Sequence, residues 1–113
     1  MRSKCFTTVW LAAIALMPHG AAAGEERAVA DGRRLAEINC EPCHAIGTAD
    51  RSTVALAPPF RTFVASGRIA QLQGVLTDNA RMAHEEMPQS QFAQTDIAAL
   101  IAYIESLAQD ANP

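Results

Sequence analysis

The most informative five residues of this 113-residue chain are Cys40-Glu41-Pro42-Cys43-His44. Two thiols at this spacing can add to the two vinyl groups of a haem, and the adjacent histidine then falls beneath the iron, where an imidazole nitrogen can bind it. The stretch therefore predicts one haem c, covalently bound through Cys40 and Cys43, with His44 as a ligand of its iron.

Three other uses of the two cysteines stay open at this point. A thioredoxin-like dithiol follows a strand and opens a helix, whereas residues 25–39, which come before Cys40, have the composition of a helix. A structural zinc ion needs four ligands. Because His84 is the only Cys or His that follows His44, a four-ligand protein site cannot be completed. The third alternative is a plain structural disulfide.

A haem iron with one histidine ligand has a second axial position. Met87 lies 43 residues after His44 and precedes Pro88, in the stretch 78–91 that lacks a clean period and is predicted as a loop. A thioether ligand raises the reduction potential relative to a second imidazole. Met87 is the expected ligand, with His84 and Met82 as alternatives, and filling of the core is the other common role of a methionine.

The N-terminus has the pattern of a secretory signal peptide. Arg2 and Lys4 precede a short apolar run over 6–17, and Ala21-Ala22-Ala23 offers small residues for cleavage. A run of 12 residues is too short for a membrane span, which takes about 20, although an uncleaved anchor is the alternative. We expect a signal peptide at 1–23, a domain at 24–113, and export to the bacterial periplasm.

Composition limits the partners. The chain has 9 Lys and Arg against 12 Asp and Glu, for a net charge of −3, and its length allows one domain. Nucleic acids and anionic membrane surfaces both select clustered positive charge, so neither is expected as a partner. No stable membrane insertion is expected after signal cleavage.

Apolar periodicity predicts an all-α fold of short helices. We expect helices over 25–39, 60–65, 68–77 and 95–108, with Thr95 as a plausible N-cap of the last. The last helix has one continuous apolar face (Ile97, Leu100, Ile101, Ile104 and Leu107). Four short helices enclose a thin core, and domains of this size often need a cofactor or another cross-link.

Taken together, the motifs resemble those of small bacterial class I monohaem cytochromes c of the periplasm. The resemblance runs from about Ala28 to Leu107 and rests on CEPCH at 40–44, APPF at 57–60, MPQ at 87–89 and DIAALIAYIESL at 96–107. It implies the cytochrome c fold, in which three to five short helices wrap around one covalently attached haem.

The resemblance also implies roles for single residues. Cys40 and Cys43 would form the thioethers, and His44 and Met87 would be the proximal and distal ligands of the metal. The carbonyl of Pro58, or alternatively of Pro59, would accept the imidazole N–H.

The family that the chain resembles packs its first helix against its last through a glycine and an aromatic residue, and the resemblance implies that these are Gly32 and Tyr103. Gly32 could alternatively be a glycine at a helix N-terminus. Ala36 stands where many relatives have an aromatic residue.

An iron with both axial positions filled transfers single electrons without binding substrate. We therefore expect a monomeric electron carrier, not an enzyme, that receives electrons from a dehydrogenase and passes them to an oxidase or reductase. Two alternatives are a dedicated haem subunit of a periplasmic oxidoreductase complex and a gas- or peroxide-reacting haem protein with a labile distal methionine. Candidates to neutralise the haem propionates are four arginines: Arg51, Arg61, Arg68 and Arg81.

Overall fold

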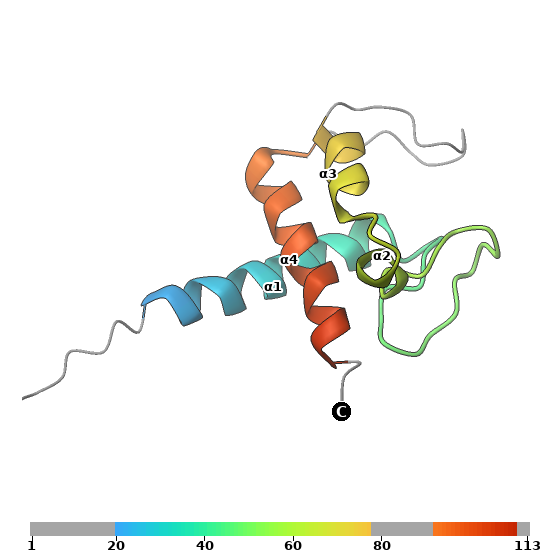
Figure 1. Ribbon diagram of the computed structural model, residues 1–113, viewed down its shortest axis with the longest axis horizontal. Helices are drawn as coiled ribbons and strands as arrows, with labels where there is room; N and C mark the ends of the chain where they lie inside the picture. The colour runs from blue at the N-terminus through green and yellow to red at the C-terminus, as the bar shows by residue number, and fades with distance from the viewer. Residues whose placement is uncertain (1–19, 78–91, 111–113) are drawn as a thin grey trace, which may run out of the picture.

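The computed structural model describes residues 20–77 and 92–110 of the chain. These residues form four helices: α1 (Gly20–Asn39), α2 (Thr62–Ala65), α3 (Ile69–Thr77) and α4 (Gln94–Asp110) (Figure 1). The described residues contain no strand, and the predicted all-α class is confirmed. None of their helices has the length and apolar character that a membrane crossing requires.

Helix α1 begins five residues earlier than the expected start at 25, because Ala21-Ala22-Ala23 are strong helix formers. The expected cleavage point after Ala23 therefore lies within its first turns, and cleavage there stays a prediction. Helix α2 is shorter than the expected 60–65, because its two preceding residues belong to a turn in which Thr62 N bonds to Pro59 O.

The expected N-cap at Thr95 is wrong. Helix α4 begins at Gln94, so Thr95 lies inside its first turn. The carboxylate of Asp96 reaches back instead, and its Oδ2 accepts a hydrogen bond from Ala93 N at 3.3 Å. A side chain at the third helical position thereby satisfies a backbone donor at the helix start.

Helix α2 ends in a Schellman motif. Gly67 has φ 68°, a left-handed conformation that costs glycine nothing. Arg68 N then bonds to Phe63 O at 2.9 Å and Gly67 N to Val64 O at 3.0 Å, which satisfies carbonyls that the helix end leaves open. This turn leads the chain directly into α3.

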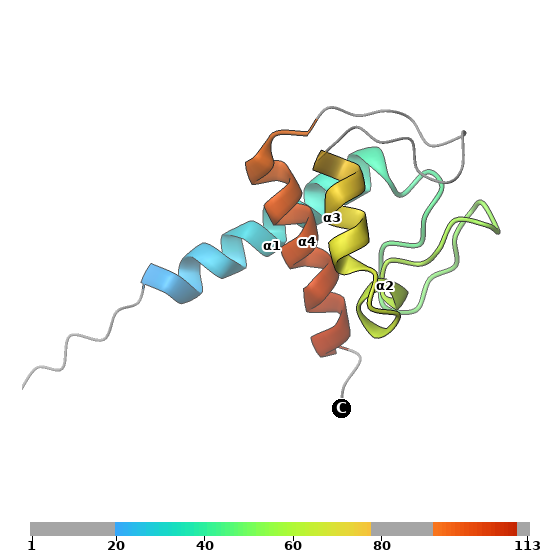
Figure 2. The same cartoon turned by 45° about the horizontal axis from the view of Figure 1, so that its top comes forward.

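The crossing of α1 and α4 is the main contact between helices (Figures 1 and 2). Gly32 lies at this crossing in the middle of α1, so its alternative reading as a glycine at a helix N-terminus is wrong. A Cβ on Gly32 would overlap the carbonyl oxygen of Ala99 and lie 2.9 Å from Cβ of Tyr103. The absent side chain lets the two backbones approach closely.

The hydrophobic core lies where α1, α2 and α3 pack on α4. Most of the apolar face of α4 is buried as its period predicts, and Ile97, Leu100 and Ile104 are each 1% exposed. Ile101 of the predicted face is only partly buried. Phe63 from α2 and Leu72 from α3 complete this core. Ala36 of α1 is fully buried, so this small residue is part of the packed interior.

Candidate functional site

Residues 40–44 continue the end of α1 by one further turn. Cys40 N and Glu41 N both bond to Ala36 O, at 2.8 and 2.9 Å. Cys43 N and His44 N in turn bond to Cys40 O, at 3.1 and 2.8 Å. Residues three and four positions apart share a face of such a turn, so the two thiols and the imidazole originate from the same side of the chain.

Cys40 and Cys43 form no disulfide with each other, and both side chains are partly buried. Burial, together with a smaller contribution from the neighbouring Cys43, raises the pKa of the Cys40 thiol to about 11. Dithiol oxidoreductases depend on the opposite perturbation, a thiol with a lowered pKa. The environment of Cys40 therefore disfavours the thioredoxin-like interpretation of the two cysteines.

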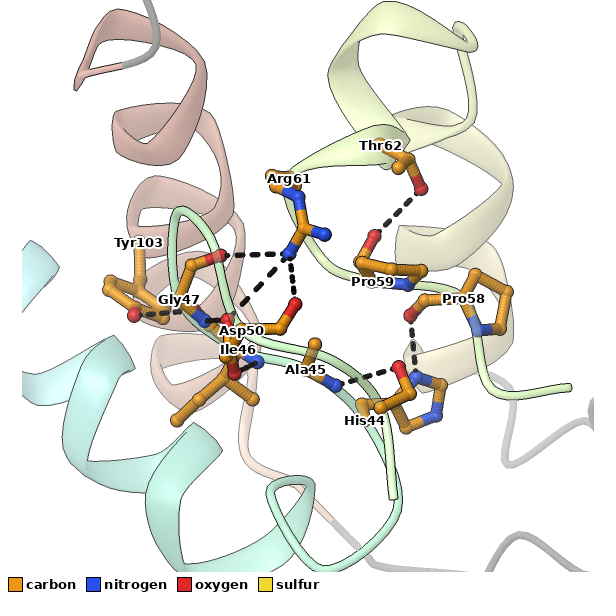
Figure 3. Close-up of polar contacts among 11 residues, drawn as sticks. His44, Ala45, Ile46, Gly47, Asp50, Pro58, Pro59, Arg61, Thr62 and Tyr103 are labelled. Carbon is orange, nitrogen blue, oxygen red and sulfur yellow. Dashed lines mark hydrogen bonds and ion pairs between the residues drawn. The ribbon is translucent and has the colours of Figure 1, made fainter. Parts of the chain in front are cut away.

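His44 is a buried side chain, 8% exposed, that packs beside Phe60 with ring centroids 5.4 Å apart. Its Nδ1 lies 2.8 Å from the carbonyl oxygen of Pro58 (Figure 3). A carbonyl can only accept, so Nδ1 carries the proton and the lone pair of the neutral imidazole is on Nε2. The carbonyl of Pro59 has other partners, since it accepts from Thr62 N at 3.0 Å and Thr62 Oγ1 at 2.7 Å.

These residues fit a covalently attached haem. Two thiols at i and i+3 and an imidazole at i+4 emerge together, and the Pro58 carbonyl orients the ring and makes Nε2 a better donor to a metal. Met87, the expected distal ligand, lies outside the described residues, as do Met82 and His84.

The model of the family described as Cytochrome c matches residues 29–108. The chain belongs to the cytochrome c family. No curated protein and no solved structure matches it. The family assignment confirms the predicted resemblance to small cytochromes c and the predicted fold.

As a cytochrome c, the chain carries haem c bound covalently through cysteines, and these are Cys40 and Cys43. Members of this family are typically electron-transfer proteins, so the chain is a haem-based electron carrier in this general sense. Proteins that exchange electrons with it are its expected class of partner.

The arginines expected near the haem propionates differ in their surroundings. Nη1 of Arg61 lies 2.9 Å from Asp50 O and 3.6 Å from Asp50 Oδ1, so this guanidinium is bound within the protein. Arg51 and Arg68 are exposed, and Arg81 lies outside the described residues.

Sequence reasoning missed Asp50 and Ser52 as organising residues of this site. Asp50 Oδ1 and Oδ2 accept the amides of Gly47 and Ile46, and Ser52 Oγ accepts the amide of Ala45. Short polar side chains in a Gly-, Thr- and Ser-containing stretch commonly bond to nearby backbone. The polar composition of this stretch was the sequence feature that indicated such hydrogen bonds, although it does not tell which backbone amides are bound.

Proposed function

We propose that this cytochrome c is an electron carrier of the bacterial periplasm, with His44 and Met87 as the axial ligands of haem c. When bound, haem c supplies a one-electron couple between Fe(III) and Fe(II). His44 would hold the iron through Nε2, and Met87 would hold it through its thioether sulfur. Two protein ligands leave no coordination position on the iron for a substrate, so the chain exchanges electrons without forming or breaking a bond to its partner.

The observation that carries this proposal is the 2.8 Å hydrogen bond between His44 Nδ1 and Pro58 O, made by a buried ring. A histidine that binds a metal through one nitrogen almost always donates the other N–H to a carbonyl, carboxylate or water. Such a bond would hold the ring in one orientation while the iron changes its oxidation state, which supports electron transfer with little structural change.

The location and partners rest on sequence features. The segment 1–23 has the pattern of a cleaved signal peptide, which supports a periplasmic place for the mature domain 24–113. A monomer that docks first with a dehydrogenase and then with an oxidase or reductase fits such a place. An exposed haem edge would be the point of contact in both complexes.

Substitution of the distal ligand tests the ligand pair. The ferric holoprotein should show the weak far-red charge-transfer band of an iron–thioether bond. Met87→Ala should abolish this band and open the iron to carbon monoxide in the ferrous state. Met82→Ala is the matched control, because it removes a second methionine from the same stretch and should leave the band in place. Loss of the band in Met82→Ala but not in Met87→Ala would overturn the assignment of Met87.

Binding of carbon monoxide to the native ferrous protein at neutral pH tests the carrier function itself. A protein with both axial positions filled should bind it poorly. Ready binding would instead indicate a gas- or peroxide-reacting haem protein with a labile distal side.

Purification of the mature chain from the periplasm, followed by mass determination, checks cleavage after Ala23.

A further inference from the structure

The backbone that directly follows His44 is fully bonded. Residues 45–47 each have a partner for both the N–H and the C=O group. The amides donate to Ser52 Oγ, Asp50 Oδ2 and Asp50 Oδ1, and the carbonyls accept from Phe60 N, Tyr103 Oη and Arg61 Nη1. The polar backbone groups of a stretch outside the helices are thereby all paired.

Two charged side chains organise this stretch. The carboxylate of Asp50 accepts the consecutive amides of Ile46 and Gly47, at 3.1 and 2.9 Å. Nη1 of Arg61 donates to Asp50 O at 2.9 Å and lies 3.5 Å from Gly47 O (Figure 3). Arg61 thus joins the turn at 47–50 to a segment more than ten residues later in the chain.

Charge attraction alone does not explain the arrangement. The side chains of Arg61 and Asp50 are 28% and 45% exposed, and their charged atoms lie 3.6 Å apart. Ion pairs this exposed contribute little to stability. The backbone hydrogen bonds of the two side chains are therefore the more important contacts, because those of the Asp50 carboxylate and the one from Arg61 to Asp50 O are charge-assisted and 2.9–3.1 Å long.

The contacts form a ladder between the segments 44–50 and 58–61. The first step is His44 Nδ1 with Pro58 O, at 2.8 Å. The second is Phe60 N with Ala45 O, at 2.9 Å. Arg61 makes the third with the turn that contains Asp50. The His44 hydrogen bond is thus one end of a ladder whose other end is the pair Asp50–Arg61.

We propose that Asp50 and Arg61 are a positioning pair for His44, which holds the two segments in the register that keeps Nδ1 on the Pro58 carbonyl. The pair thereby tunes how strongly the imidazole donates to the haem iron. This inference rests on the proposed function, in which His44 is an iron ligand. It gives Arg61 a role different from neutralising a haem propionate.

The charge-conserving variant Arg61→Lys of the holoprotein tests the pair. Arg61 makes its contacts with Asp50 O, Gly47 O and Asp50 Oδ1 through Nη1 alone. A lysine side chain ends one bond short of that nitrogen, so its ammonium does not reach the same oxygens. We expect exchange of the His44 Nδ1 proton with solvent, followed by NMR of the ferrous protein, to become about tenfold faster, since a tenfold factor matches the loss of one ordinary hydrogen bond. The reduction potential should rise, because a more weakly bonded imidazole is a poorer donor to Fe(III).

Two control variants separate positioning from general stability. Arg34→Lys makes the same change at an exposed arginine of α1 and should leave exchange and potential unchanged. Val29→Ala trims a partly buried side chain of α1 and should lower the unfolding midpoint without moving the potential. If Arg61→Lys behaves like Val29→Ala, with a lower midpoint but the wild-type exchange rate and potential, the proposal is overturned.

A double-mutant cycle provides a second test that does not depend on one variant. Asp50→Asn retains one acceptor oxygen but loses the carboxylate that bridges two amides. If the pair acts as a unit, the effects of Asp50→Asn and Arg61→Lys on proton exchange should be clearly smaller together than their sum. Additive effects would contradict the pair. If the spectrum of the wild-type holoprotein showed no histidine bound to the iron, the proposed function would be wrong. The inference about Asp50 and Arg61 would then be wrong as well.

Discussion

The hydroxyl of Tyr103 donates a 2.7 Å hydrogen bond to the carbonyl oxygen of Ile46, across 57 positions of sequence. Tyr103 is a buried residue of α4, and Ile46 follows the predicted iron ligand His44 by two residues. The contact ties the last helix to the haem-binding segment. The same tyrosine packs at Gly32, so one side chain joins the helix crossing to the site.

Tyr103→Phe should destabilise the holoprotein by about 1–2 kcal/mol. The substitution preserves the ring and its packing but leaves the buried carbonyl of Ile46 without this donor, and an unsatisfied buried acceptor costs on the order of 1–3 kcal/mol. Denaturant unfolding of both proteins measures the difference. Equal midpoints and equal slopes would show that the hydrogen bond contributes nothing to stability.

The buried hydroxyl of Tyr103 should also make the folded protein less stable at alkaline pH. Burial raises the pKa of Tyr103 above its ordinary value of 10, so the folded state retains the phenol proton at a pH where the unfolded chain has released it. The resulting stability is fully present below pH 10 and is lost as pH rises through the higher, folded-state pKa. The free energy of unfolding of the wild type should therefore fall more steeply above pH 10 than that of Tyr103→Phe. Parallel pH profiles would contradict this expectation.

Gly32→Ala should destabilise the fold by about 2–3 kcal/mol or prevent folding, because overpacking at a close contact displaces backbone. The new Cβ would overlap Ala99 O, a backbone atom that cannot move aside alone. Gly74→Ala is the matched control, since a Cβ at this position of α3 meets nothing within 4 Å. In a helix interior that control should gain about 0.5–1 kcal/mol. Thermal unfolding of both variants checks the contrast in sign.

Extraction with acidified organic solvent tests the covalent attachment. The haem should stay with the wild-type polypeptide, and one thioether should still retain it in Cys40→Ser and in Cys43→Ser. The double variant should release it. Cys40 packs against the core cluster, so Cys40→Ser should lower the unfolding midpoint more than Cys43→Ser does. Pigment that washes out of the wild type would contradict the covalent bond.

Local sequence was enough to predict the all-α class and the attachment cysteines. The periodicity of 95–108 depends on neighbours three and four residues apart, and so does the grouping of Cys40, Cys43 and His44. The helix ends were predicted less well. Thr95 has the residue type of an N-cap, but the helix begins before it and Asp96 makes the capping hydrogen bond. The role of Met87 as distal ligand stays a prediction.

Only the tertiary structure revealed how the site is held. The closeness of Asp50 to Arg61, and of Tyr103 to Ile46, depends on the path of the loop and on the crossing of α1 and α4. A sequence pattern records which groups can form hydrogen bonds, because that is a property of each residue type. It does not record which distant groups meet, because that follows from the packing of the whole chain.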